Sequence, residues 1–253
     1  MLALQWLAKT RDVLGEVEKT QLPAIRQAAE LMARSIQAER WVHTFGCGHA
    51  TIPVEEMYPR IGGFVGFHPM VELPLTFFTR VTGEMGIHQF LFLERAPGYG
   101  DAIMKSYSFD ARDTMWIFSH TGINNVNLDV AFRAKELGMR IVATGSAAQA
   151  QSSTPRHSSG KKLFDLADVV IDTCVPAGDS SVPLAGHQDN IGPISTMAFV
   201  AVVWLTITTV AELLAARGVK LFIHPSHNVP GDTTAQERLD AALSEYRRRA
   251  ASL

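Results

Sequence analysis

Apolar residues in the first forty positions recur at steps of three and four. The stripe consists of Leu22, Ile25, Ala29, Met32 and Ile36. This spacing is typical of an amphipathic helix, and we predict that residues 1–40 form two helices, divided near Gly15 or Pro23. The apolar face of these helices must be covered, either by the rest of the chain or by a second subunit.

From residue 41 onward, short runs of β-branched and aromatic residues alternate with helical patterns. We predict strands at Trp41–Phe45, Phe64–Phe67, Thr114–Phe118, Met139–Ala143 and Val169–Ile171, with Phe90–Leu93 as a further candidate. Helical patterns occupy Ile52–Arg60, Asp101–Tyr107 and Val126–Leu137. Strands that alternate with helices favour a parallel sheet covered on both faces.

This pattern divides the chain into three parts. We expect N-terminal helices over residues 1–40, one α/β domain over 41–218, and a C-terminal extension over 219–253 that includes a polar helix at Asp232–Arg249. A chain of 253 residues is long enough for one such domain with helical additions.

A stretch without charge separates Asp189 from Glu212, and its length would allow a transmembrane helix. Gly192 and Pro193 stand at its start, and no basic cluster flanks it. A helix buried on all sides in a soluble protein has the same apolar composition. We therefore predict that Ile194–Ala216 is a core helix and that no membrane is involved.

The composition is that of an ordinary globular protein, with 47% apolar and 19% charged residues. A formal charge of −2 gives no reason to expect nucleic acid as a partner. The two cysteines form no disulfide framework, and Met1–Ala8 lacks the pattern of a signal peptide. We expect a cytoplasmic protein.

Two turns combine small and polar residues between a strand and a helix. The first is Gly46-Cys47-Gly48-His49, and the second is Ser119–Asn124. Ligands of open parallel sheets bind beyond the carboxyl ends of the strands, where helix N-termini attract anions. The alternative is that the hydroxyl and amide side chains only cap the following helix.

The second turn lies within a recognisable pattern. Thr114–Gly145 resembles the core signature of sugar isomerase (SIS) domains: a hydrophobic strand, Ser-x-Ser/Thr-Gly-x-Thr/Ser, a helix ending in Ala-Lys-x-x-Gly, and another strand. The Gly46-x-Gly48 turn is similar to the family's first loop, and Asp165–Ile171 is similar to its last strand.

Other segments resemble a bacterial subgroup of uncharacterised SIS proteins related to phosphoheptose isomerases. They are Thr154–Asp172, Gly192–Thr196 and Asn228–Asp232. The resemblance implies a flavodoxin-like three-layer sandwich with a parallel five-stranded sheet, which binds a phosphorylated sugar.

The resemblance also assigns the binding residues. Ser119, Thr121, Gly122 and Asn124 would take the phosphate, with Asn124 standing where the family has Thr or Ser. An amide at this position can still donate a hydrogen bond.

In the first loop, Gly46 and Gly48 match the family pattern, but Ala50 replaces its serine. His49 or Thr51 would then make the contact with the sugar or phosphate.

Aldose–ketose isomerisation needs a base near C2 and an acid at the carbonyl oxygen. Glu55 and Glu56 resemble a glutamate pair in phosphoheptose isomerases, but adjacent helix residues point about 100° apart, so we prefer Glu56 as the base. The alternative is a surface salt bridge. His157 could serve as acid or base, and Lys161 or Arg156 could bind phosphate, unless this is an ordinary solvated loop.

Further positions have more than one interpretation. Ser195 either caps its helix or reaches the sugar, His120 supports the turn, and Glu94-Arg95 is either a structural ion pair or a substrate clamp. Cys47 is best explained as a small residue in a tight turn.

His224 and His227 lack a third metal ligand nearby, so we expect no metal and no cofactor. The leading hypothesis is a phosphosugar isomerase that works through an enediol. The alternative is a non-catalytic phosphosugar sensor or an assembly scaffold built on a SIS dimer, and another reaction on the same ligands is a third possibility. We expect a homodimer or homotetramer.

Overall fold

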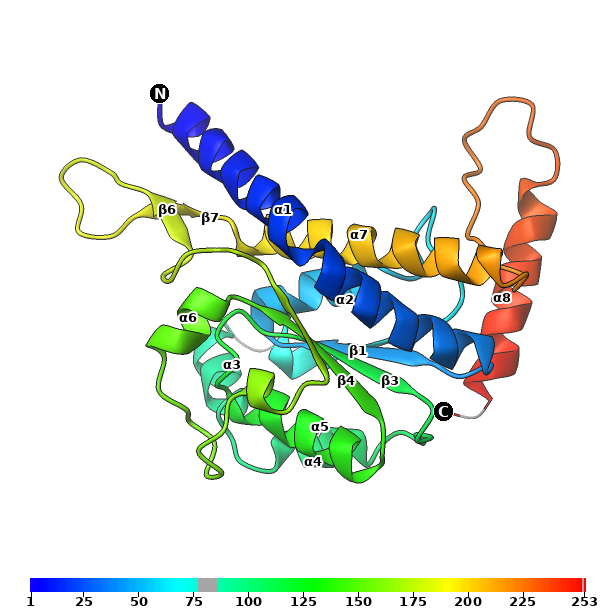
Figure 1. The fold of residues 1–253 in the computed structure, drawn as a ribbon, viewed down its shortest axis with the longest axis horizontal. Coiled ribbons are helices and arrows are strands. Elements are labelled where there is room, and N and C mark those ends of the chain that lie inside the picture. Colours follow the sequence, from blue (N-terminus) through cyan, green and yellow to red (C-terminus); the bar gives the residue numbers. More distant parts are fainter. Residues whose placement is uncertain (77–85, 252) are drawn as a thin grey trace.

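The computed structural model describes residues 1–76, 86–251 and 253, and shows a central sheet between two layers of helices (Figure 1). The sheet has five strands in the order β2-β1-β3-β4-β5, and all neighbouring strands are parallel. The strands are β1 (Val42–Gly46), β2 (Phe67–Met70), β3 (Thr114–Phe118), β4 (Arg140–Gly145) and β5 (Val169–Asp172). This order is the flavodoxin-like one, so the predicted fold class is confirmed.

Helices connect the strands and flank the sheet. They are α1 (Leu2–Gln37), α2 (Ile52–Glu55), α3 (Ile87–Leu93), α4 (Tyr99–Met104), α5 (Asn125–Glu136), α6 (Ala147–Ser152), α7 (Ser195–Ala216) and α8 (Ala235–Ala250). Short 3-10 segments lie at Gly48–Thr51, Leu73–Leu75 and Leu163–Asp165. A small antiparallel pair, β6 (Ser180–Val182) and β7 (Ile191–Pro193), precedes α7.

The strands separate two hydrophobic cores because successive side chains point to opposite faces. In β3, Trp116 and Phe118 belong to the core formed with α1 and α7, whereas Met115 and Ile117 belong to the core formed with α4 and α5. Both faces are covered, so the strand carries no polar alternation.

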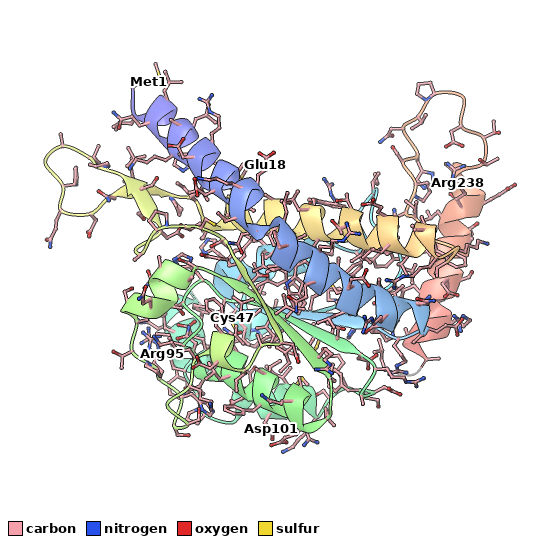
Figure 2. The ribbon with its side chains drawn as sticks, viewed as in Figure 1. Met1, Glu18, Cys47, Arg95, Asp101 and Arg238 are labelled. Atoms are coloured by element: carbon pink, nitrogen blue, oxygen red, sulfur yellow. The ribbon has the colours of Figure 1, made fainter. Side chains whose placement is uncertain are left out.

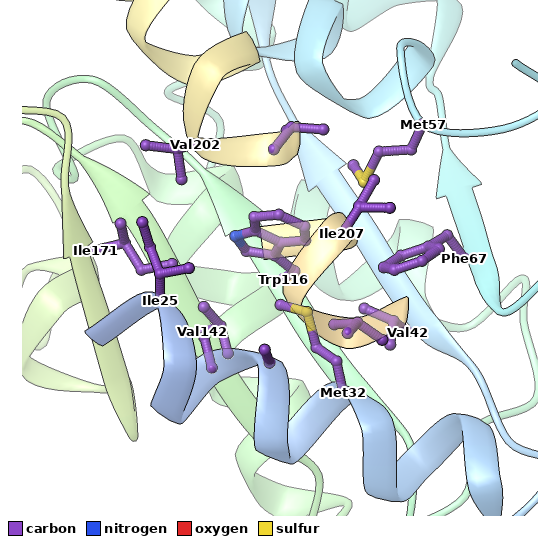
Figure 3. Packing of buried hydrophobic residues seen from close by; sticks show 14 of the residues in the cluster. Ile25, Met32, Val42, Met57, Phe67, Trp116, Val142, Ile171, Val202 and Ile207 are labelled. Carbon is purple, nitrogen blue, oxygen red and sulfur yellow. The ribbon is translucent and has the colours of Figure 1, made fainter. Parts of the chain in front are cut away.

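Trp116 lies at the centre of the first core (Figure 3). It packs among Ile25 and Met32 of α1 and Val202 and Ile207 of α7. The N-terminal stripe is therefore covered in large part by the chain itself.

Helix α1 corrects the expectation of two helices, because it continues without interruption through Pro23. An interior proline costs a helix roughly 3 kcal/mol. Val17 and Ile25, on either side of that position, are each 1% exposed in the core. Packing on both sides of the proline offsets the cost.

Three other expectations need correction. Phe90–Leu93 belongs to helix α3 and not to a strand. The second strand starts at Phe67, since Phe64 pairs instead with Ile223 in an isolated bridge. Helix α2 ends at Glu55, shortly before Pro59, which disfavours a helical conformation in the residue before it.

Helix α7 is, among the described residues, the one helix long and apolar enough to cross a membrane by length and composition. It lies along α1 over the sheet (Figure 1). Phe199, Val203 and Val210, which are at most 1% exposed, face the core. In its most apolar 18-residue window 44% of the residues are buried and Met197 is 47% exposed, so α7 is a core helix on one face but is not buried on all sides.

Candidate phosphosugar site

The two predicted loops lie side by side at the centre of the sheet. Strand order changes direction between β1 and β3, and the register pairs Gly46 with Phe118 at their carboxyl ends. Cys47 and Arg95 both lie at this end of the sheet (Figure 2). Such a topological switch point is where open α/β sheets bind ligands.

A cavity of about 220 Å³ opens at this point. Its lining comes from both loops, from the start of α5 and α7, and from the end of α3. The lining residues are Cys47, His49, Ala50, Glu94, Ser119, His120, Thr121, Asn124, Asn127, Asp179, Ser195 and Phe199.

Two glycines allow the second loop, Ser119–Asn124, to form. Gly122 has φ of +65°, in the left-handed region that favours glycine. A Cβ at Gly145 of β4 would stand 2.0 Å from the carbonyl oxygen of Ser119, so the loop can approach β4 only because that position has no side chain. The Ser119 Oγ accepts a hydrogen bond from the Gly122 amide at 3.1 Å. Its own O–H is thereby left to donate elsewhere.

The backbone of this loop presents donors. The amides of Thr121, Ile123 and Asn124 make no hydrogen bond to any described residue, and α5 begins at Asn125. Unpaired amides close together at the start of a helix form an anion-binding concavity. We call these amides and the hydroxyls of Ser119 and Thr121 the anion cradle.

Glu94 is a buried carboxylate on the same cavity, 7% exposed. Its Oε2 accepts a hydrogen bond from Asn124 Nδ2 at 2.5 Å, and its Oε1 lies 3.6 Å from Arg95 Nε. Burial raises the pKa of Glu94, although the cations Arg95 and Arg156 oppose this shift. Arg156 donates to Asn124 Oδ1, so a guanidinium stands beside the cradle.

His120 also lines the cavity, and both of its ring nitrogens are buried without a hydrogen-bond partner among the described residues. Burial lowers the pKa of His120, with the nearby Asp179 opposing the shift, so the imidazole is neutral at pH 7. A neutral imidazole carries one donor and one acceptor nitrogen.

Asp179 closes another side of the cavity and caps α7. Its carboxylate accepts hydrogen bonds from the amides of Ile194 and Ser195 at 2.9 and 2.8 Å, and from Ser195 Oγ at 2.6 Å. The hydroxyl of Ser195 therefore lies at the cavity but is held in the cap.

In the first loop, most side chains bond within the protein. A Cβ at Gly46 would stand 2.2 Å from the Ala50 carbonyl oxygen, which explains this glycine. Thr51 Oγ1 donates to the carbonyl of Gly48, a glycine with φ of +62°, and so points into its own turn. The exposed His49 is the predicted binding residue of this loop that lines the cavity.

Cys47 is buried against α5. Its Sγ donates to Asn127 Oδ1 at 3.6 Å, and burial raises the pKa of the thiol well above its usual value. The thiol is therefore neutral at pH 7.

The structure places the predicted acid–base residues outside the cavity lining. Glu56 accepts hydrogen bonds from Trp204 Nε1 at 3.2 Å and pairs with Arg60 at 3.0 Å. Glu55 is exposed at the end of α2.

His157 and Lys161, in the basic loop Arg156–Lys162, also lie outside the cavity lining. His157 lies 3.3 Å from Asp129 and 2.8 Å from Ser159, packed against Phe132 of α5. Lys161 is exposed and absent from the lining, while Arg156 of the same loop reaches the cradle.

Within the described part of the chain, no group of three His, Cys, Asp or Glu side chains could hold a metal ion. His224 lies beside Tyr58 at a ring distance of 6.0 Å, and His227 is exposed.

Known structures share this fold. A phosphoheptose isomerase from Francisella tularensis superposes with a TM-score of 0.53 over 84% of this chain and 100% of its own, at 17% identity. A phosphoheptose isomerase from Neisseria gonorrhoeae gives 0.54 over 83% of this chain and 97% of its own, at 12% identity.

Sequence relatives extend along most of the chain. A UPF0309 protein from Oceanobacillus iheyensis is 30% identical over 227 residues, 90% of each chain, and one from Streptomyces coelicolor is 30% identical over 232 residues, 90% of this chain and 89% of its own. The SIS domain model matches residues 5–146, more than half of the chain. The chain therefore belongs to the SIS domain family and, within it, to the group of its UPF0309 relatives.

Proposed function

We propose that this protein binds a phosphorylated sugar in the cavity at the β1–β3 switch point and interconverts its aldose and ketose forms. The observation that carries the proposal is that the anion cradle and the buried carboxylate of Glu94 share one cavity. A phosphosugar isomerase needs both features, one to hold the phosphate and one to move a proton. SIS membership and the isomerases among the structural neighbours support phosphosugar binding.

The phosphate would lie over the cradle. Three amides and two hydroxyls offer hydrogen bonds to its oxygens, and charge-assisted bonds of this kind are about twice as strong as neutral ones. Arg156, held at Asn124, adds a positive charge. Because the whole chain carries a formal charge of −2, these local donors must supply the attraction.

The cavity volume limits how much of the ligand is enclosed. At about 220 Å³ it is smaller than the roughly 300 Å³ at which pockets for drug-sized molecules begin. The cavity would enclose the phosphate and the reacting carbons, and the remaining hydroxyls would extend through its mouth, past the exposed His49.

A non-catalytic phosphosugar sensor is the second candidate, and one observation favours it. Ala50 lines the cavity where related proteins would offer a hydroxyl, and the neighbouring Thr51 donates to Gly48 instead. A site with fewer sugar contacts suits recognition of the phosphate without turnover.

The experiment is a panel of aldose and ketose phosphates of five to seven carbons, assayed for thermal stabilisation and for conversion. A ligand that binds only the native state at a hundredfold excess over Kd stabilises it by about 2.7 kcal/mol. Stabilisation with conversion supports the isomerase, and stabilisation without conversion supports the sensor. If no phosphorylated sugar shifts the unfolding temperature at millimolar concentration, both functions are excluded.

We also propose that the protein is a homodimer or homotetramer. The first half of α1 projects from the body of the molecule (Figure 1), and Leu2, Leu4 and Leu7 are 38, 59 and 43% exposed there. Exposed apolar residues gathered on one element are typical of an interface.

A further inference from the structure

We infer that Glu94 and His120 are the acid–base pair of the isomerisation, with Glu94 moving the proton between carbons and His120 moving protons between oxygens. The inference rests on the proposed function and names the residues that would perform it. It replaces Glu56 and His157, which the sequence favours.

Glu94 is held at both its backbone and its side chain. Its carbonyl accepts a hydrogen bond from the amide of Val126 at 3.3 Å, in the first turn of α5, and its carboxylate accepts one from Asn124. The backbone amide of Asn124 belongs to the anion cradle, and its side-chain amide bonds to Glu94. One residue therefore connects the phosphate donors with the carboxylate. A sugar whose phosphate lies on the cradle would place its carbon chain along Glu94.

The surroundings of Glu94 favour a base of increased strength. The carboxylate is 7% exposed and faces the Cys47 thiol, and burial raises its pKa against the opposing effect of Arg95 and Arg156. A carboxylate with few water contacts gains more from taking a proton than an exposed one does.

His120 can donate protons to the sugar oxygens and accept protons from them. Its ring nitrogens are buried and lack partners among the described residues, and Asp179 is the charged group that faces it. An unpaired buried nitrogen costs stability unless a ligand supplies its hydrogen-bond partner. The C1 and C2 oxygens of an open-chain sugar would supply the missing partners.

The proton transfers balance without any other reactant. Glu94 takes the C2 proton of the aldose, the C–H electron pair forms the C1=C2 bond, and the carbonyl oxygen at C1 takes a proton from His120. In the second step the O2 proton returns to His120, C2=O forms, and the C1 carbon takes the proton back from Glu94. Both residues end in their starting states, and the sugar is neither oxidised nor reduced overall.

The competing pair is less suited to this chemistry. The carboxylate of Glu56 already bonds to Trp204 and pairs with Arg60, and His157 bonds to Asp129 and Ser159. Neither of the two lines the cavity.

The test compares Glu94→Gln with Glu56→Gln, which makes the same change at the carboxylate outside the cavity. Glutamine at position 94 can still accept the hydrogen bond from Asn124, so the fold and the cradle are kept. The measurements are exchange of the C2 hydrogen with solvent deuterium, conversion of the sugar phosphate, and thermal stabilisation by the same ligand. We expect Glu94→Gln to reduce exchange and conversion at least a hundredfold while ligand stabilisation stays within a few-fold of the parent. Glu56→Gln should leave all three unchanged.

His120→Gln separates the two roles. It should slow conversion about a hundredfold but leave C2 exchange less affected, because the proton on carbon still has its base. Normal exchange in Glu94→Gln, or a loss confined to Glu56→Gln, overturns the inference and leaves the isomerase standing. A parent protein that binds sugar phosphates but exchanges no hydrogen also overturns it, in favour of the sensor. A parent protein that binds none excludes the proposed function itself.

Discussion

Asn124 and Glu94 stand thirty residues apart in the chain, yet Asn124 Nδ2 donates to Glu94 Oε2 at 2.5 Å inside the protein. The contact joins the loop that follows β3 to the end of helix α3. Because Arg156 donates to the other atom of the same amide, Asn124 orients a cation and a carboxylate at once. An amide is suited to this position because its two ends have opposite hydrogen-bonding character.

Replacing this amide by a second carboxylate should disrupt the site. In Asn124→Asp two buried carboxylates would compete for one position, which raises the pKa of one of them and repels an incoming anion. We expect stabilisation by inorganic phosphate to weaken at least about tenfold. Asn124→Ser, which restores a hydroxyl and adds no charge, is the control and should retain phosphate binding. Equal phosphate binding by Asn124→Asp and the parent would contradict the cradle.

The hydroxyl of Thr121 should contribute directly to anion affinity. A hydrogen bond to a charged group is worth about 1.5–3 kcal/mol, so Thr121→Val should weaken binding of phosphate or a sugar phosphate by roughly ten- to a hundredfold. Calorimetric titration measures this. Thr208→Val is the matched control, because the Thr208 hydroxyl bonds only to the backbone of α7. Unchanged affinity in Thr121→Val would place the anion elsewhere.

The sequence was sufficient for the parts of the fold that local chemistry determines. Strands β1, β3 and β4 are apolar runs followed by small or polar turns, and the Ser119–Asn124 loop follows directly from that pattern. Helix α3 was misread because Phe90–Leu93 is a short apolar run, and such runs have no period that separates strand from helix.

The site was harder to predict because its members come from separate loops. Arg156 and Glu94 meet at Asn124 only after β4 and α3 have been placed, and nothing in their neighbours along the chain indicates that contact. Lys161 and His157 lie in the same loop as Arg156 and could also carry positive charge or donate hydrogen bonds. Which of the three side chains reaches Asn124 depends on the path of the folded chain.

Close packing between β4 and the cradle should make Gly145 intolerant of a side chain. A Cβ there would stand 2.0 Å from the Ser119 carbonyl oxygen, so Gly145→Ala must displace the loop. We expect a loss of stability of about 1–3 kcal/mol together with weaker phosphate binding.

Gly15→Ala provides the opposite case. Gly15 is exposed within α1 with nothing within 4 Å of a Cβ, so alanine should stabilise by about 0.5–1 kcal/mol. Denaturant unfolding measures both variants. A Gly145→Ala protein as stable as the parent would show that the loop is free to move.

The projecting half of α1 should be part of a subunit interface. Light scattering should give the mass of two or four chains, and Leu4→Lys combined with Leu7→Lys should shift it toward one chain, because charge at a buried apolar contact is costly. Lys9→Glu, an exposed change of charge one turn away, is the control for effects on net charge. A parent protein with the mass of one chain would contradict the proposal.

A buried polar network at the amino ends of β1 and β3, opposite the site, should make stability depend on pH. His43 Nδ1 and His68 Nδ1 lie 2.9 Å apart, and His43 Nε2 lies 3.3 Å from Asp113, whose carboxylate also pairs with Arg40. Burial lowers the pKa of His43, and it lowers that of His68 from 6.5 to about 4. Both rings are therefore neutral in the folded protein at pH 7.

Below pH 6.5 the unfolded chain binds protons at these histidines and the folded protein does not, so stability should fall as the pH falls. The loss through His68 should be complete near pH 4, where the folded protein also takes its proton. Lowering the pKa of His68 from 6.5 to about 4 corresponds to about 3 kcal/mol of stability. His68→Phe should flatten the dependence of unfolding free energy on pH between 6.5 and 4, even though it lowers stability at pH 7 by leaving His43 Nδ1 without its partner. His227→Phe, at an exposed histidine, should keep the parent slope. If the parent and His68→Phe have the same slope, then folding does not lower the pKa of His68 and the prediction is wrong.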